Sequence, residues 1–222
     1  MFDDLLQIAI QYLPRLLVGA LQTIKITSIG VSLGFLLGLV IGFCRAYKVP
    51  LVTQLGQVYV AIIRGTPLLV QLFFIFFGLP SLTGSAIPPL VAGISAITIN
   101  SGAYFSEIVR GAVQSIRKSQ VEAGRSLGLG WFKTMRFVIW PQAFINALPS
   151  LGNQFIISLK DTSLMAVISV EELTRNGQII IAATFRAFQI WLLVALIYLV
   201  MTGLLSIILN QVEKKFSRYM YA

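Results

Sequence analysis

The sequence from Ile26 to Cys44 reads ITSIGVSLGFLLGLVIGFC and contains no charged residue. A helix needs about 20 apolar residues to cross the hydrocarbon core of a bilayer, so this stretch is long enough for one membrane span. Within it, glycine recurs at every fourth position, at Gly30, Gly34, Gly38 and Gly42. Residues four apart share one face of a helix, where small side chains let a second backbone approach closely. We interpret this face as a packing surface within the subunit, and it indicates no activity.

The composition extends this membrane character to the whole chain. Of its 222 residues, 57% are apolar and 11% are charged, and the mean hydropathy is +0.85. Soluble domains carry about 25% charged residues, and disordered chains carry few apolar residues and many charges. Both classes are therefore excluded. Histidine is absent and Cys44 is the one cysteine, so the sequence offers neither an intrachain disulfide nor the commonest metal ligand.

The remaining uncharged stretches run over Gly65–Ser106, Phe137–Leu159 and Ala187–Val212. The first is long enough for two spans, and a proline- and glycine-rich loop between Gly78 and Pro89 separates them. All are too long and too apolar for the alternating strands of an outer-membrane barrel. The sequence predicts an all-α integral membrane protein with one transmembrane domain over residues 1–222. Its five transmembrane helices are expected at about 20–44, 65–78, 89–113, 137–160 and 187–212.

The placement of the basic residues predicts the orientation. In the five-span arrangement, basic residues gather on one side, as Arg45, Lys48, Arg117, Lys118, Arg125, Lys133, Arg136, Lys214, Lys215 and Arg218. Because Lys and Arg concentrate in cytoplasmic loops, we expect the N-terminus outside and the C-terminus in the cytoplasm. The net charge of +9 is thus interpreted as loop charge and not as a nucleic-acid surface. Acidic residues precede the first basic one, so we expect no cleaved signal peptide.

Three segments outside the spans are expected to be helical. One of them, residues 51–63, repeats apolar side chains at helical spacing, at Leu51, Leu55, Val58, Tyr59 and Ile62. Residues 2–13 place apolar side chains on one face, which is typical of a helix lying on the outer membrane surface. Residues 161–186 mix apolar and charged side chains on the outer side, and short helices are expected there.

The cytoplasmic segment 119–128 reads SQVEAGRSLG and predicts a two-turn helix. Ser119 and Glu122 have the spacing of a capping box, in which each side chain binds a backbone amide. Gly128 supplies the left-handed residue that ends a helix. Gly124 in the middle of the helix costs about 1 kcal/mol relative to alanine. A bare face that permits close approach would offset this cost.

This segment resembles the EAA loop, which marks the membrane subunits of ATP-binding-cassette importers. Glu122-Ala123-Gly124 is followed after three residues by Gly128, and after nine more by Val138-Ile139-Trp140-Pro141. The family form is Glu-Ala-Ala, three residues, Gly, nine residues, Ile-x-Leu-Pro. The stretches at 64–71 (RGTPLLVQ), 106–111 (SEIVRG) and 160–164 (KDTSL) are similar to signatures of the polar amino acid permease family.

The resemblance implies the type I importer permease fold and a location in the prokaryotic inner membrane. In that family the short loop helix docks on an ATPase subunit, which assigns ATPase coupling to Glu122, Ala123, Gly124 and Gly128. The implied partners are two ATPase subunits, a second permease copy (the same chain or a close relative), an extracytoplasmic substrate-binding protein and the amino acid. ATP and magnesium would be bound by the ATPase, and this chain would bind no cofactor.

Polar side chains within the spans are the candidates for solute binding, because burying them in a membrane is costly. Asn100, Tyr104 and Glu107 share one helix face, and Asn100 is expected near the bilayer midplane, where transporters bind solutes. A second polar stripe comprises Asn146, Ser150, Asn153 and Gln154. For Asn146 and Ser150, hydrogen bonding between helices is the favoured interpretation.

Asp161 completes the predicted solute-binding set of Asn100, Tyr104, Glu107 and Asp161. The family often has Asn at this position, so an Asp would suit a basic amino acid such as arginine, lysine or histidine. Two simpler interpretations stay open: Glu107 can pair with Arg110, and Asp161 with Lys160.

The sequence contains no phosphate-binding loop, no histidine-based nucleophile and no cysteine cluster. We therefore expect no catalytic residue, no metal site and no enzymatic activity in this chain. Two alternatives remain. A self-sufficient channel or ion-coupled carrier would transport without an ATPase, and a scaffold would tolerate replacement of Asn100 and Asp161.

Overall fold

The computed structural model describes residues 2–221, with side chains placed for 7–216, and those residues form helices without strands. Its helices are α1 (Phe2–Ala46), α2 (Val52–Gly65), α3 (Leu68–Phe73), α4 (Leu79–Thr83), α5 (Pro89–Gln114), α6 (Lys118–Ser126), α7 (Trp131–Thr134), α8 (Trp140–Asp161), α9 (Leu173–Thr184) and α10 (Ala187–Tyr221). Short π-helical segments at Phe74–Gly78 and Met135–Ile139 and a 3-10 segment at Thr162–Ile168 connect some of them.

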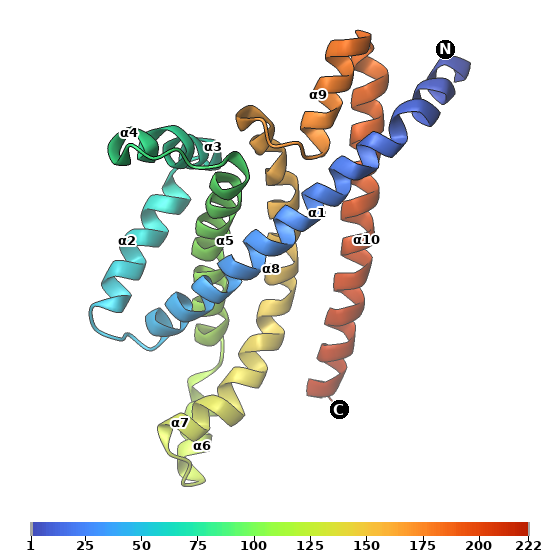
Figure 1. The fold of residues 1–222 in the computed structure, drawn as a ribbon. Coiled ribbons are helices and arrows are strands. Elements are labelled where there is room, and N and C mark those ends of the chain that lie inside the picture. The colour runs from blue at the N-terminus through green and yellow to red at the C-terminus, as the bar shows by residue number, and fades with distance from the viewer. Residues whose placement is uncertain (1, 222) are drawn as a thin grey trace.

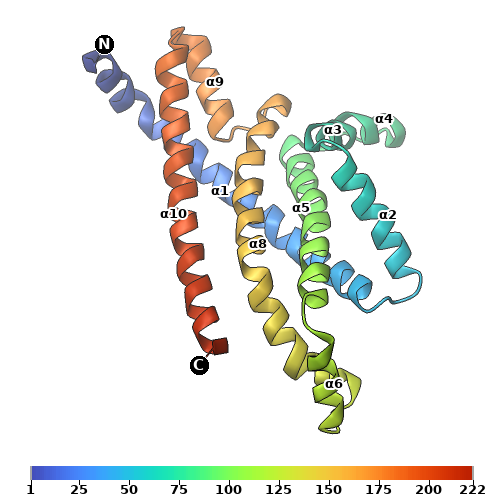
Figure 2. The same ribbon diagram turned by 180° about the vertical axis from the view of Figure 1, so that it is seen from behind.

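α1 crosses the other long helices obliquely and lies on one face of them (Figures 1 and 2). α2, α5, α8 and α10 run roughly alongside one another, with α6 and α7 at one end and α3, α4 and α9 at the other (Figures 1 and 2). The two chain ends lie toward opposite ends of the molecule in both views. This arrangement is compatible with an odd number of crossings.

α1 is a single helix of 45 residues that continues through Pro14. The prediction of a separate surface helix over 2–13 is therefore wrong, because one continuous helix runs from these residues into the predicted span 20–44. At 1.5 Å per residue, α1 is about 68 Å long, more than twice the thickness of a bilayer core. Only a strongly tilted or protruding helix of this length fits a membrane.

The glycine face of α1 packs directly on α5. A Cβ atom at Gly38 would lie 2.5 Å from Phe105 Cβ, 2.6 Å from the carbonyl oxygen of Gly102 and 2.9 Å from the amide of Ser106. A Cβ at Gly42 would lie 2.7 Å from the carbonyl oxygen of Ser106. Packing within one subunit, as inferred from the glycine spacing, is confirmed for these contacts.

The N-terminal half of α1 packs on α9 in a similar way. A Cβ at Gly19 would lie 2.9 Å from both the Leu173 Cα and the Asn176 Nδ2. Thr23 accepts a hydrogen bond at 3.2 Å from the Leu173 amide, and Arg15 donates to Asn176 at 3.2 Å. One helix therefore contacts α5 through one end and α9 through the other.

The predicted span at 65–78 is wrong in its bounds, because the helical axis turns within it. α2 ends at Gly65, α3 begins at Leu68, and the two parts meet at 106°. Thr66 is extended and Pro67 has no amide proton, so the helix cannot continue through this pair. The apolar residues 52–65, placed outside the spans by the sequence, form the helix that runs alongside α5 (Figure 1).

The other predicted spans fall on helices with similar or longer bounds. α5 matches 89–113 within one residue, α8 covers most of 137–160, and α10 extends beyond 187–212. By length and apolar character alone, Gln7–Ala46 and Ala187–Phe216 qualify as membrane spans among the described residues, and the bent pair Val52–Gly65 and Leu68–Thr83 qualifies if taken together. The count of five crossings stays a prediction.

Candidate functional site: the coupling segment and the polar interior

The short helix predicted at 119–128 is α6, and its start differs from the prediction. Arg117 occupies the N-cap with extended backbone, and no side chain caps the helix. Ser119 lies inside the first turn, so the capping box of Ser119 and Glu122 is wrong. The extended residue that an N-cap requires lies two positions earlier than expected.

The end of α6 follows the prediction. Gly128 adopts a left-handed conformation with φ of +76°. Its amide donates to the Arg125 carbonyl at 2.9 Å, and the Leu129 amide donates to the Gly124 carbonyl at 3.1 Å. These two bonds form a Schellman motif, which satisfies carbonyl groups that the end of the helix would leave unpaired.

Gly124 explains how so short a helix is held. It is buried, and a Cβ there would lie 2.7 Å from Thr134 Cγ2. Thr134 is fully buried in α7 and donates a hydrogen bond to the Gly130 carbonyl at 3.2 Å. The bare face expected of Gly124 thus contacts Thr134 of the same chain, and this contact positions α6.

The opposite face of α6 is exposed. Glu122 and Ala123 both lie on it, and Gly128 is exposed at the end. Sequence reasoning missed Leu127, whose side chain is 82% exposed beside the terminal glycine. A large apolar residue at the end of an otherwise polar, exposed helix was the available signal.

Glu107 is bound by two arginines. Arg45 at the end of α1 donates to Glu107 Oε2 at 2.9 Å, and Arg110 donates to Oε1 at 3.0 Å. Arg45 is buried and also donates to Ser106 at 3.1 Å. The pairing of Glu107 with Arg110 is therefore present, and Arg45, which the sequence placed among loop charges, is an additional partner.

Asn100 and Tyr104 are contacted from α2 and α3. Asn100 is buried and donates to Gln71 Oε1 at 3.1 Å. Gln71 in turn donates to the Ile63 carbonyl at 2.7 Å and the Thr66 carbonyl at 3.1 Å, which satisfies the end of α2 at the bend. The Arg64 guanidinium lies 5.4 Å from the Tyr104 ring centroid, in the range of a cation–π contact.

Asp161 is the last residue of α8 and is half-buried. Among the described residues, no cation lies within ion-pair distance of its carboxylate, so the pairing with Lys160 is not formed. Gln154 and Ser158, both buried, precede it by seven and three residues and share its helix face. Gln154 donates to Ser158 at 3.3 Å.

The structure separates the predicted polar stripe of α8 into two environments. Asn146, Ser150 and Asn153 are exposed, whereas Gln154 is buried. Asn146 donates to Ser115 at the end of α5 at 3.2 Å, as expected for hydrogen bonding between helices.

Glu172 is a buried acid that sequence reasoning did not single out. It is fully buried, caps α9, and accepts hydrogen bonds from the amides of Thr174 (2.9 Å) and Arg175 (2.7 Å) and from Tyr198 (3.0 Å). Burial raises the pKa of the Glu172 carboxyl, although these donors favour its ionised form. An acid followed by Leu-Thr-Arg-Asn at the start of a helix was a signal for a cap.

The described residues contain no group of three potential metal ligands. What they combine is a short exposed helix held at one end of a helical bundle and polar side chains placed between its long helices. The family of binding-protein-dependent transport system inner membrane components matches residues 30–218. The chain belongs to this family.

The permease is similar to named relatives over almost its whole length. It is 48% identical over 204 residues to the glutamine transport system permease protein of Escherichia coli (strain K12), covering 91% of this chain and 93% of the relative. It is 34% identical to the L-cystine transport system permease protein of Bacillus subtilis (strain 168), over 93% of this chain and 89% of the relative. The resemblance to polar amino acid permeases of ATP-binding-cassette importers is thereby confirmed.

Solved structures agree with this assignment. The permease matches a chain of an amino acid ABC transporter, crystallised with histidines, with a TM-score of 0.88 and 41% identity over 93% of this chain and 96% of that one. It matches a chain of an inward-facing methionine ABC transporter with a TM-score of 0.79 and 17% identity, over 93% and 98% of the two chains, which shows the shared fold alone.

Proposed function

We propose that this permease forms the translocation pathway for basic amino acids, paired with a second copy of itself or a close relative in a prokaryotic inner membrane. The N-terminus lies outside and α6 faces the cytoplasm. Two ATPase subunits bind α6 and supply ATP and magnesium, and an extracytoplasmic binding protein delivers the solute to the outer segments. The observation that carries the solute class is Asp161, a half-buried carboxylate without a cationic partner among the described residues.

The two acids of the predicted solute site, Glu107 and Asp161, differ in whether their charge is already paired within the chain. Glu107 already receives Arg45 and Arg110, so its charge is compensated within the chain. Asp161 forms no ion pair among the described residues, and a carboxylate without a partner attracts a cation. Asp161 therefore supports binding of a positively charged group, which a basic amino acid carries on its side chain.

A second candidate solute is glutamine. The permease shares 48% identity with a protein named for glutamine transport. Every amino acid carries an ammonium group that a carboxylate can bind, so Asp161 is compatible with a neutral solute as well. Competition between arginine and glutamine separates the two candidates.

Replacing Asp161 by Asn is expected to reduce arginine-stimulated ATP hydrolysis by about tenfold or more, the range for losing a charge-assisted hydrogen bond. The measurement uses the permease in liposomes with its ATPase and binding protein, with arginine or glutamine as the solute. Glu171→Gln removes an exposed carboxylate from the outer segment and serves as the control. Equal losses for both solutes would contradict selectivity for basic side chains and favour a contact with the common ammonium group.

The coupling role rests on the exposed face of α6. Nucleotide-driven closure of the ATPase pair would move the two α6 helices and switch the pathway between outward and inward access, because nucleotide binds the two states with different affinity. Glu122 is an exposed acid on a helix that also carries Lys118 and Arg125. Its carboxylate is suited to a donor on the ATPase surface.

Glu122→Ala is expected to lower solute-stimulated hydrolysis by about 5- to 150-fold, the range of typical coupling free energies. Gln120→Ala, an exposed truncation on the same helix, is the matched control. Co-purification of the ATPase is measured in parallel. Transport through liposomes that contain the permease alone would overturn the importer proposal and support a carrier.

A further inference from the structure

A cavity of about 240 Å3 lies between the end of α1 and the segment that follows α6. Aromatic side chains dominate its walls, and one basic side chain completes them. The lining residues are Phe43, Tyr47, Trp131, Phe132, Met135, Arg136 and Trp140. None of the residues predicted for solute binding or ATPase coupling lines it, so it is separate from the site described above.

The aromatic walls are packed against one another. The ring centroids of Phe43 and Trp140 are 3.9 Å apart, and those of Tyr47 and Trp131 are 4.9 Å apart in an edge-on arrangement. Trp131 is 50% exposed and Phe132 is 70% exposed, so the cavity opens to the surroundings of the protein. The Tyr47 hydroxyl is buried and has no hydrogen-bond partner among the described residues. This set of rings is typical of the membrane interface, where aromatic side chains lie at headgroup level.

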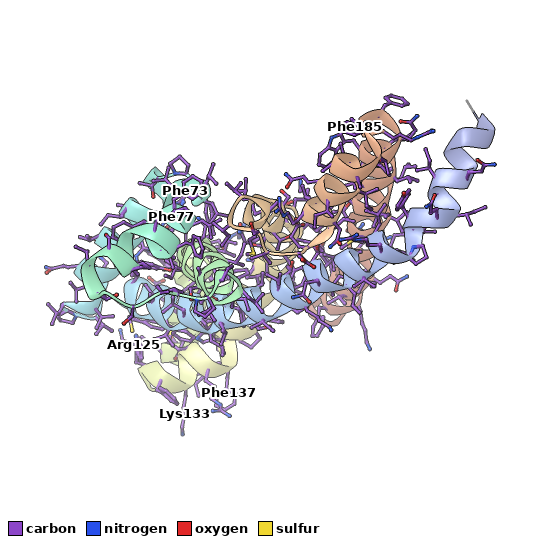
Figure 3. The ribbon with its side chains drawn as sticks, turned by 45° about the horizontal axis from the view of Figure 1, so that its top comes forward. Phe73, Phe77, Arg125, Lys133, Phe137 and Phe185 are labelled. Atoms are coloured by element: carbon purple, nitrogen blue, oxygen red, sulfur yellow. The ribbon has the colours of Figure 1, made fainter. Side chains whose placement is uncertain are left out.

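The cavity also carries uncompensated positive charge. Arg136 lines it, Lys133 lies three residues earlier, and Lys48 follows Tyr47 directly. No acid among the described residues forms an ion pair with any of the three, because both such pairs in that part of the chain involve Glu107. Arg136 instead lies 5.7 Å over the Phe137 ring. Figure 3 shows Lys133 and Phe137 pointing away from the helical bundle.

We propose that this cavity binds one anionic phospholipid of the cytoplasmic leaflet. The aromatic rings contact the upper acyl chain and the glycerol region, and Arg136 and Lys133 bind the phosphate. The charge selects an anionic lipid over a zwitterionic one, since each basic side chain near a membrane surface contributes attraction to anionic lipids. The choice of leaflet rests on the orientation proposed above.

The position of the cavity gives the lipid a structural role. Phe43 and Tyr47 belong to the end of α1 and the residue after it, whereas Trp131 and Arg136 belong to the segment that holds α6 through Thr134. A bound lipid therefore contacts both α1 and the support of the coupling helix.

The test uses tryptophan fluorescence of the full-length permease in vesicles. The sequence contains three tryptophans, and Trp191→Phe leaves Trp131 and Trp140, both of which line the cavity. Brominated phosphatidylglycerol or brominated phosphatidylcholine is added at equal mole fraction as the quencher. We expect stronger quenching by the brominated anionic lipid.

Two variants test the headgroup contacts. Arg136→Gln and Lys133→Gln are each expected to reduce the preference for the anionic quencher by about fivefold, the effect of about 1 kcal/mol per basic side chain. Lys215→Gln removes an exposed charge from α10 on the same side and is expected to keep the preference. Equal quenching by the two lipids, or an unchanged preference in both variants, would overturn the proposal. Because the assay contains no ATPase or solute, its failure is distinct from failure of the transport proposal.

Discussion

Replacing Gly38 by alanine is expected to separate α1 from α5 and to destabilise the permease by about 3 kcal/mol, the upper end of the range for overpacking. The added methyl group would lie 2.5 Å from Phe105 Cβ and 2.6 Å from the Gly102 carbonyl oxygen. One of these neighbours is backbone, so a change of side-chain rotamer cannot relieve the contact. α1 or α5 must shift along the whole face.

Gly203→Ala is the matched control, because it makes the same change in another long apolar helix. Nothing lies within 4 Å of a Cβ built at Gly203. Alanine favours a helix by about 1 kcal/mol over glycine, so this variant is expected to be as stable as the parent or more so. Thermal unfolding of the purified protein in detergent distinguishes the two. Equal melting temperatures for Gly38→Ala and the parent would show that the α1–α5 contact is not as close as described.

Replacing Glu107 by alanine is expected to destabilise the permease by about 3 kcal/mol, the lower end of the effect of leaving one member of a buried ion pair without its partner, because Glu107 itself is partly exposed. Arg45 is the reason, since its side chain is only 8% exposed and depends on Glu107 for charge compensation. Arg110 is more exposed and can reach water or Gln114 instead.

The double variant Arg45→Met, Glu107→Leu tests this explanation. Replacing a buried ion pair by apolar residues of similar volume is often neutral or stabilising, so the double variant is expected to regain most of the lost stability. Glu171→Ala removes an exposed acid and controls for the change in net charge. The ion-pair explanation would be wrong if the double variant were less stable than Glu107→Ala in the same unfolding assay.

Much of the fold could be predicted because charges and prolines mark the ends of apolar helices. Pro89 begins α5 as predicted, and the glycine spacing of α1 correctly indicated a close helix contact. The bounds of the second span were missed because hydropathy measures apolar character and carries no information on direction. The Thr66-Pro67 pair held that information, since the residue before a proline avoids the helical conformation.

The candidate site was predictable where a residue acts through its own backbone. Gly128 ends α6 with a positive φ, as its residue type indicates. The contacts of Glu107 with Arg45 and of Gly124 with Thr134 were not predictable, because tertiary packing determines them. The same holds for the Ser119 cap, where the spacing of two side chains did not determine where the helix begins.

The single unbroken α1 also has a mechanical consequence. This helix packs on α9 at Gly19 and on α5 at Gly38, and the two glycines are about 28 Å apart along the helix axis. If α1 turned as a stiff rod about the Gly38 contact, a tilt of roughly 5° would displace Gly19 by roughly 2 Å. That displacement is large enough to break the hydrogen bond between Thr23 and the Leu173 amide. A motion that begins where α5 meets α1 would therefore reach α9 through rigid geometry alone.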